Sequence, residues 1–165
     1  YTVNQDNKFS AAILRLANPY GPYQSINLDR GSIIPVLIRR AIEYSEFKPY
    51  TIFGTGKETR SFCYISDVID AMMIAIENIE SQNLIGPLNI GSKNRIRIVD
   101  LAKKIIEISG KDIALERLSA PAPITMSQTL NCRLAKSILN EWEPQVTLED
   151  GLKKMYSHIE KQLEK

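Results

Sequence analysis

The chain has 165 residues and a formal net charge of +2 at pH 7, with 44% hydrophobic and 24% charged residues. This length suffices for one domain with its own hydrophobic core, and the composition excludes a disordered chain. Lys and Arg are scattered among nearly as many acids, so we expect no nucleic-acid partner. The apolar stretches are too short to span a bilayer and no signal-peptide pattern opens the chain, so we expect no membrane association.

The two cysteines and the single histidine offer no catalytic or metal-binding set. Cys63 and Cys132 lie far apart without a CxxC or Cys/His grouping, which predicts a reduced cytoplasmic protein with no metal site. His158 falls on an expected C-terminal helix, and we interpret it as a surface residue rather than a general base. Because the chain begins with Tyr1 and its first ten residues hold no cap or turn, we expect it to be cut from a longer protein.

Strand-like and helical runs alternate along the chain, which predicts an α/β fold. The run 11–17 reads as a buried strand that Asn18-Pro19 ends sharply. A helical stripe of apolar residues then extends from Ile34, with Ser32 as the expected N-cap. Two short strands are expected next, at 51–53 and 61–65, with a glycine turn after the first.

A second helix is expected after Ser66, which we interpret as its N-cap, with Asp67 in the first turn. One face of this helix is apolar and is predicted to lie in the core. Its members are Val68, Ala71, Met72, Ala75, Ile76 and Ile79. A strand is then expected at 87–91, closing on a glycine turn.

The last third of the chain continues the alternation. A helix is predicted to end at Gly110, and a short strand to follow at 113–115. After a proline-rich loop at 119–129, a short helix is expected, marked by Leu134, Ala135, Ile138 and Leu139. Thr147 with Asp150 resembles a capping box and predicts the start of the final helix.

The segment 53–67, FGTGKETRSFCYISD, is the most informative part of the sequence. A glycine turn delivers a short strand that begins near Arg60, whose planar guanidinium can bind a diphosphate through two N–H groups. Spacing alone favours a structural alternative, in which Arg60 forms an ion pair with Glu58 or Asp67. The turn Gly54-Thr55-Gly56 lacks the spacing of a phosphate-binding loop, and we interpret it as a tight turn.

A second candidate lies at the end of the first expected strand. Asn18 would sit at the carboxyl edge of a parallel sheet, where open α/β sheets bind ligands. The alternative is an Asn-Pro turn in which the Asn18 side chain satisfies its own backbone.

Five motifs occur in order along the chain, and together they carry more weight than any one of them. They are R-x-x-N-x-Y-G-P from Arg15, G-S-x-I-P from Gly31, G-x-G-x-x-T-R-S-F-x-Y-I-x-D from Gly54, N-I-G-S from Asn89 and W-x-P-x-x-x-L-x-x-G-L from Trp142. Residues 1–165 resemble in this respect the C-terminal half of the extended short-chain dehydrogenase/reductases, the nucleotide-sugar epimerase/dehydratase family. The stretch 59–67, TRSFCYISD, is most similar to UDP-glucuronate decarboxylases and related sugar epimerases.

The resemblance implies a fold: the last strands of a Rossmann-type sheet together with a small mixed α/β substrate-binding domain. It also implies binding roles for particular positions. Arg60 would hold the nucleotide diphosphate, and Pro19 would touch the nicotinamide of the cofactor through its main chain. The other positions implied to contact the nucleotide sugar are Asn18, Ser32, Ile33, Phe53 and Asn89.

The resemblance places the family's glycine-rich cofactor loop and its Tyr-x-x-x-Lys acid/base pair before Tyr1, so we expect NAD or NADP to be bound mainly by another part of the protein. Two departures from the family pattern stand out. The loop 120–127 lacks the family's usual Arg and Gly-Asp, and Asn131 stands where the family usually has Asp. We therefore expect no second arginine anchor from this loop.

These observations lead to two hypotheses. The first is an NAD(P)-dependent nucleotide-sugar epimerase, dehydratase or decarboxylase, a homodimer as is usual in the family, for which this chain supplies the sugar-nucleotide pocket and no catalytic residue. The second is a non-catalytic binding or scaffolding domain of the same fold. Binding of nucleotide sugars that depends on Arg60 would distinguish the two.

Overall fold

The computed structural model describes residues 11–78, 87–120, 123, 125–127 and 130–164. The chain divides into two compact units, which are described separately below. Unit 1 comprises residues 1–19, 61–94 and 129–146, and unit 2 comprises residues 20–60, 95–128 and 147–165. Helices and strands alternate along the chain, and each unit contains a parallel strand pair, so the predicted α/β class is confirmed.

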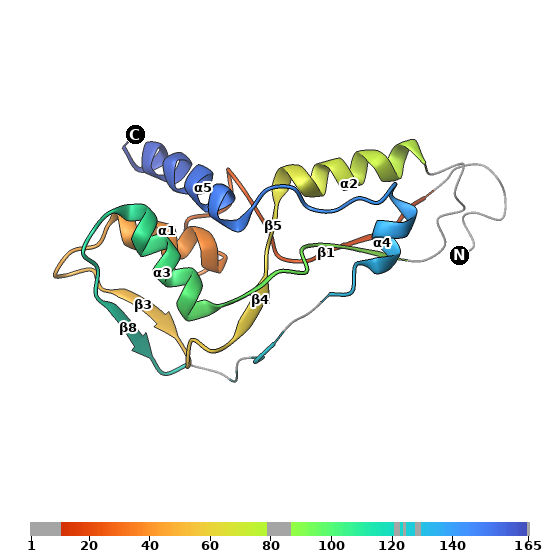
Figure 1. Cartoon of the computed structure of the whole chain (residues 1–165). Helices are drawn as coiled ribbons and strands as arrows, with labels where there is room; N and C mark the ends of the chain where they lie inside the picture. Colours follow the sequence, from red (N-terminus) through yellow and green to blue (C-terminus); the bar gives the residue numbers. More distant parts are fainter. Residues whose placement is uncertain (1–10, 79–86, 121–122, 124, 128–129, 165) are drawn as a thin grey trace. The chain divides into compact units, whose positions relative to one another are not determined.

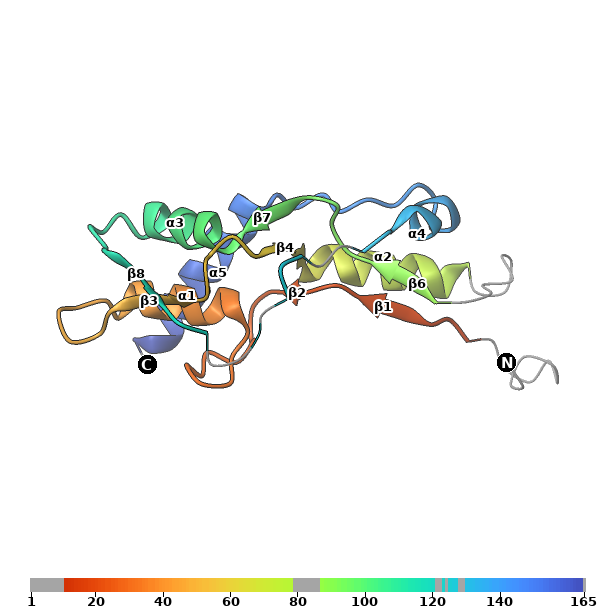
Figure 2. The same cartoon turned by 90° about the horizontal axis from the view of Figure 1, so that it is seen from below.

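Unit 1 is built on the parallel pair β1 (Leu14–Leu16) and β6 (Leu88–Ile90), which Figure 2 shows side by side. The helices α2 (Ile65–Glu77) and α4 (Arg133–Ile138) and the short strand β5 (Cys63–Tyr64) complete it. Its core is formed by Cys63, Val68, Ala71, Ala75, Leu88, Ile90, Ala135, Leu139 and Trp142.

Unit 2 contains the parallel pair β3 (Tyr50–Phe53) and β8 (Leu115–Leu118), in register from Tyr50 opposite Leu115 to Phe53 opposite Leu118. Three helices, α1 (Ile33–Ile42), α3 (Ile98–Ser109) and α5 (Leu148–Leu163), pack against one another beside this pair (Figure 1). The Tyr50 hydroxyl is buried and donates to the Ala102 carbonyl at 3.2 Å, which ties β3 to α3. The remaining bounds are β2 (Pro19–Tyr20), β4 (Thr59–Ser61) and β7 (Arg95–Arg97).

Local chemistry sets the helix ends of unit 2 largely as the sequence predicts. Gly110 ends α3 with a φ of 64°, in the left-handed region that glycine enters without strain. The Thr147 hydroxyl caps α5 by accepting from the Asp150 backbone N–H at 3.1 Å, so the predicted cap is confirmed. Ser32 occupies the N-cap position of α1, but its hydroxyl makes no capping hydrogen bond.

Two expectations for α2 are wrong. Ser66 is not an N-cap, because α2 already begins at Ile65 with Tyr64 as its cap. Met72 and Ile76 are 42% and 60% exposed rather than buried, since α2 turns only Val68, Ala71 and Ala75 into the core of unit 1. Ile79, expected on the same face of α2, lies outside the described residues.

The expectation of a buried strand at 11–17 is wrong in extent and burial, because β1 spans only Leu14–Leu16 and Leu16 is 44% exposed. The other strand expectations hold in outline and differ in detail. The expected strand at 61–65 is divided, because β4 ends at Ser61 and β5 begins at Cys63. The expected strand at 113–115 begins later, at Leu115. Across the described part of the chain, no helix is both long enough and apolar enough to cross a membrane.

Candidate functional site

Unit 2 contains a hollow of about 360 Å³ between α1, β3 and the segment that leads into β4. Three positions implied by the family resemblance line it: Ile33 at the start of α1, Phe53 at the end of β3 and Arg60 in β4. Further apolar side chains complete its wall, among them Leu28, Val36, Leu37, Ile52 and Ile98. Phe53 is 46% exposed, so its ring is available to a ligand.

Charged side chains of both signs also line this hollow, which we call the α1–β3 hollow. Two are arginines, Arg40 from α1 and Arg60, and two are acids, Asp29 and Glu58. Arg40 donates from Nη1 to the Thr51 carbonyl at 2.6 Å, which holds its guanidinium against β3. Arg40 was not predicted from the sequence, although it lies one helical turn after Val36 and Leu37, which also line the hollow.

Arg60 is half-buried and makes no ion pair within the described residues. Its Nη1 donates to the Thr59 carbonyl at 2.8 Å, which leaves the other N–H groups of the guanidinium for a ligand. The two carboxylates that spacing offered as partners are engaged elsewhere. Glu58 accepts from Thr55, and Asp67 accepts from the backbone N–H groups of Gln145 and Val146 at 3.1 Å each. The structural alternative for Arg60 is therefore not observed.

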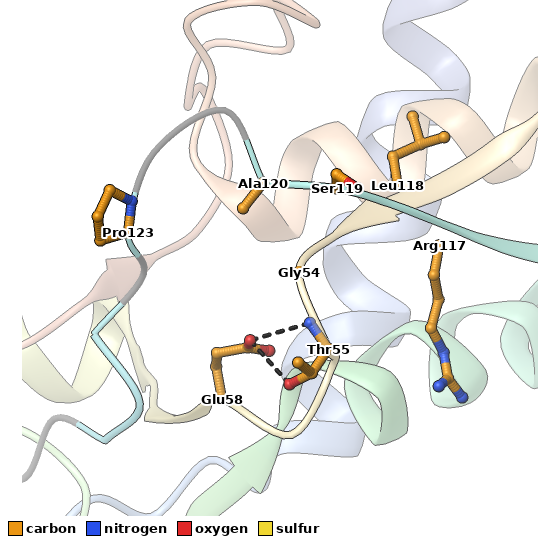
Figure 3. A pocket seen from close by; sticks show the side chains of 8 residues that line it. All are labelled: Gly54, Thr55, Glu58, Arg117, Leu118, Ser119, Ala120 and Pro123. Atoms are coloured by element: carbon orange, nitrogen blue, oxygen red, sulfur yellow. Dashed lines mark hydrogen bonds between the residues drawn. The ribbon is translucent and has the colours of Figure 1, made fainter.

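Glu58 is buried, with 3% of its surface exposed, and one of its carboxylate oxygens organises the preceding turn. Its Oε1 accepts from the Thr55 N–H at 3.0 Å and from the Thr55 hydroxyl at 2.9 Å, as Figure 3 shows. Burial raises the pKa of the Glu58 carboxyl, but the hydrogen bonds from Thr55 and the nearby backbone N–H groups of Gly56 and Glu58 outweigh burial and hold the pKa below its usual value. Glu58 is therefore a carboxylate at neutral pH.

The turn before Glu58 is fixed by backbone conformation and by the start of α3. Gly54 and Gly56 have φ values of 82° and 74°, which only glycine adopts without strain. The N–H groups of Ile98 and Val99 donate to the Glu58 and Gly56 carbonyls at 2.9 and 3.0 Å. A side chain at Gly56 would also bring its Cβ to 3.0 Å from that of Val99. The interpretation of Gly54-Thr55-Gly56 as a tight turn fits these contacts.

Glu58 also lines a second hollow, of about 530 Å³, together with Gly54 and Thr55 of this turn. Figure 3 shows its wall, with Gly54, Thr55 and Glu58 on one strand-to-strand segment and Arg117 directed away from the Glu58 carboxylate. Glu58 was considered in the sequence only as a partner for Arg60. The Thr-x-x-Glu spacing of Thr55 and Glu58 is the signal that could have identified the local hydrogen bonds.

The remaining implied positions do not line the α1–β3 hollow. Ser32 is exposed at the N-cap of α1, one residue before Ile33. In unit 1, Asn18 has a φ of 42° and donates from Nδ2 to the Ser61 carbonyl at 2.9 Å, so its side chain does not satisfy its own backbone. Pro19 follows it, half-buried, in β2.

Asn89, also in unit 1, lies in β6 opposite Arg15 of β1. Its Nδ2 donates to the Asn131 carbonyl at 2.8 Å, while its Oδ1 is buried without a hydrogen-bond partner among the described residues. Of the loop 120–127 that departs from the family pattern, residues 121, 122 and 124 lie outside the described residues. Its end is tied to β4, because the Thr59 N–H donates to the Met126 carbonyl at 2.8 Å.

A Tyr-x-x-x-Lys spacing does occur within the chain, at Tyr44 and Lys48, and the structure shows that it is not an acid/base pair. The two residues flank a turn closed by Ser45 and Lys48 rather than lying one turn apart on a helix. The Tyr44 hydroxyl accepts from the Ala114 N–H at 3.3 Å, and the Lys48 ammonium pairs with Glu43 at 3.7 Å.

A family model described as the NAD dependent epimerase/dehydratase family matches residues 1–91 of the chain. The chain belongs to this family. The resemblance inferred from the ordered motifs is thus confirmed.

Epimerase/dehydratase family members of known function align with most of the chain. UDP-glucuronic acid decarboxylase 1 of Arabidopsis thaliana is 31% identical over 145 residues, which cover 88% of this chain and 31% of that protein. UDP-glucuronic acid decarboxylase 1 of Xenopus tropicalis is 29% identical over 164 residues, 99% of this chain and 37% of that protein. The chain thus spans about a third of the length of these relatives.

Solved structures of the same family share the fold. UDP-glucuronic acid 4-epimerase of Bacillus cereus, in complex with UDP-glucuronic acid and NAD, is 35% identical with a TM-score of 0.77, covering 92% of this chain and 45% of that one. UDP-glucose 4-epimerase of Thermotoga maritima, with UDP-glucose, is 28% identical with a TM-score of 0.80, covering 94% and 47%. The fold is therefore that of the corresponding part of a Rossmann-type extended short-chain dehydrogenase/reductase.

Proposed function

We propose that this chain supplies the nucleotide-sugar pocket of an NAD-dependent epimerase, dehydratase or decarboxylase, and that the α1–β3 hollow of unit 2 is where the nucleotide binds. The observation that carries the proposal is the meeting in one hollow of Ile33, Phe53 and Arg60, an arginine that has no ion-pair partner among the described residues. A nucleoside diphosphate needs an apolar wall with an aromatic face for the base and a guanidinium for the phosphates. This hollow offers both.

Each implied position has a role in the proposal. Arg60 binds the diphosphate through the N–H groups that Thr59 leaves unused. Phe53 stacks on the base, and Ile33 closes over the nucleoside. Ser32, Asn18 and Asn89 remain proposed contacts, Asn89 because its buried Oδ1 accepts no hydrogen bond from the described residues.

The names of similar proteins support a UDP-sugar as the substrate class, since the relatives include UDP-glucuronic acid decarboxylases and UDP-sugar epimerases. The family's cofactor is NAD, which when bound supplies a hydride acceptor for the sugar ring. We assign a single position of this chain, Pro19, to contact with the cofactor. The sequence contains no glycine-rich dinucleotide loop that would bind the rest of it. The free state of Cys63 and Cys132 supports our placement of the protein in the cytoplasm.

Calorimetry on the full-length gene product with UDP-, GDP-, CDP- and dTDP-sugars tests the pocket. We expect one nucleotide class to bind, and Arg60→Ala to weaken that binding by about tenfold to a hundredfold, as expected for loss of hydrogen bonds to a charged group. Lys57→Ala is the matched control, because Lys57 belongs to the same turn, is exposed and does not line the hollow. It removes the same charge and should change the dissociation constant by less than about threefold.

Two outcomes would contradict the proposal. If Arg60→Ala and Lys57→Ala weaken nucleotide-sugar binding equally, binding depends on the net positive charge of the protein and not on a contact with Arg60. Absence of binding by any nucleotide sugar would favour the non-catalytic scaffolding alternative instead.

A further inference from the structure

The α1–β3 hollow contains a buried acceptor that the proposed diphosphate contact does not use. Glu58 lines the hollow together with Arg60, and only one of its two carboxylate oxygens is satisfied. Its Oε1 takes both hydrogen bonds from Thr55, whereas its Oε2 is buried and has no hydrogen-bond partner among the described residues. A buried polar atom without a partner is uncommon in proteins and is a reason to look for a ligand.

The chemistry of Glu58 restricts what that ligand group can be. An ionised carboxylate is an acceptor only, so the partner of Oε2 must be a donor. A phosphate oxygen carries the same sign of charge and is excluded. Among the groups of a nucleotide sugar, this leaves the uncharged donors, namely hydroxyls and amide-type N–H groups.

The position of Glu58 relative to Arg60 indicates which part of a nucleotide is in reach. Arg60 lies in β4, and Glu58 comes immediately before the strand, on the other side of Thr59. Both residues line the same hollow. Both the ribose and the hexose of a nucleotide sugar are joined to the diphosphate. With the diphosphate on Arg60 and the base against Phe53 in the same hollow, the hydroxyls between these two contacts are those of the ribose. Carboxylates bind ribose hydroxyls in the same way in dinucleotide sites.

We propose that Oε2 of Glu58 accepts a hydrogen bond from a ribose hydroxyl of the bound nucleotide and so makes the pocket selective for the sugar of the nucleoside. This assignment rests on the proposed function, because it requires the diphosphate on Arg60. Glu58 thereby has two tasks, one oxygen holding the turn through Thr55 and the other binding the ligand.

The test compares the binding of UDP, 2′-deoxy-UDP and 3′-deoxy-UDP to the full-length gene product. We expect the wild-type protein to bind one of the deoxy nucleotides about tenfold or more weakly than UDP, because that nucleotide lacks the donor for a charged acceptor. Which analogue is affected identifies the hydroxyl.

Variants of Glu58 then separate ligand binding from the structural task. The quantity compared is the dissociation constant of the affected deoxy analogue divided by that of UDP, the deoxy-to-ribo ratio. Glu58→Gln keeps the shape of the side chain and the oxygen that accepts from Thr55, but replaces Oε2 with an amide N–H₂ group. This variant should reduce the deoxy-to-ribo ratio at least about threefold. Glu58→Ala should bring the ratio close to one. Thr55→Val is the matched control: it removes the hydroxyl bond to Oε1, leaves Oε2 unchanged, and should keep the wild-type ratio. Circular dichroism verifies that each variant is folded, and Glu58→Gln carries the test if Glu58→Ala does not fold.

The two proposals fail in different ways. If wild-type protein binds UDP and both deoxy analogues equally well, or if the ratio is the same in Glu58→Gln and Glu58→Ala as in wild type, the ribose assignment is overturned and the proposed pocket stands. If the wild-type protein binds no nucleotide at all, the proposed function fails and the ribose assignment fails with it.

Discussion

Gly151 is the residue at which a single methyl group would disturb unit 2 most directly. It lies in the first turn of α5 and is buried against the Tyr20 ring, and a Cβ there would come within 2.8 Å of the Tyr20 Cζ and closer still to its hydroxyl oxygen. The glycine belongs to the last of the ordered motifs, and this contact gives a physical reason for its presence at that position.

We expect Gly151→Ala to lower the free energy of unfolding by about 1–3 kcal/mol, the usual cost of overpacking, as measured by chemical denaturation. In a helix with free space at this position, Gly→Ala would raise the free energy of unfolding by about 1 kcal/mol. The sign of the measured change therefore shows whether the Tyr20 ring obstructs the added methyl group. Gly110→Ala is a control of a different kind, because a Cβ there meets nothing within 4 Å and only the φ of 64° is strained. A Gly151→Ala variant as stable as wild type would contradict the Tyr20 contact.

Residue types predicted part of the site and missed the rest for a definable reason. Ile33, Phe53 and Arg60 follow from the ordered motifs, and the structure brings them to one hollow. The sequence did not predict that Arg60 forms no ion pair with Glu58 or Asp67, because it does not reveal the groups that donate hydrogen bonds to these two carboxylates. Asp67 takes its hydrogen bonds from backbone 78 and 79 residues away, which no local pattern reveals.

At the scale of elements, the two helix starts α1 and α5 provide a matched pair. Both begin after a hydroxyl residue in extended backbone, but only Thr147 makes a capping hydrogen bond, and Ser32 makes none. We expect Thr147→Ala to lower the free energy of unfolding by about 1 kcal/mol and Ser32→Ala to lower it by less than about 0.5 kcal/mol. Thermal or chemical denaturation of the two variants measures the difference, and equal effects would contradict the observed capping geometry.

The existence and type of most elements were predictable, whereas the buried face of α2 was not. Periodicity identifies an apolar stripe, but α2 carries apolar residues around more than one face, so the stripe does not specify which face packs. Unit 1 buries Val68, Ala71 and Ala75, and Met72 and Ile76 remain exposed. Some predicted element ends differ from the observed ends by one or two residues, as at Ser66 and Leu115. A helix can begin after any extended residue whose carbonyl accepts the first helical hydrogen bond, and the end of a strand depends on its partner strand.

For the whole molecule, the fold class and family were accessible because five separate motifs occur in a fixed order over nearly the full chain. The chemistry of the site needed the structure, since it depends on which donors and acceptors are already occupied. One carboxylate oxygen of Glu58 and most of the Arg60 guanidinium have no partner in the described part of the chain, and our proposals for the α1–β3 hollow rest on these atoms.

A crystal structure of the full-length gene product with a bound UDP-sugar tests the central claim most directly. We expect the diphosphate to lie within hydrogen-bond distance of the Arg60 guanidinium, with the base against Phe53 and Ile33 in the α1–β3 hollow. A nucleotide bound in another part of the molecule, with Arg60 and Phe53 untouched, would contradict the claim.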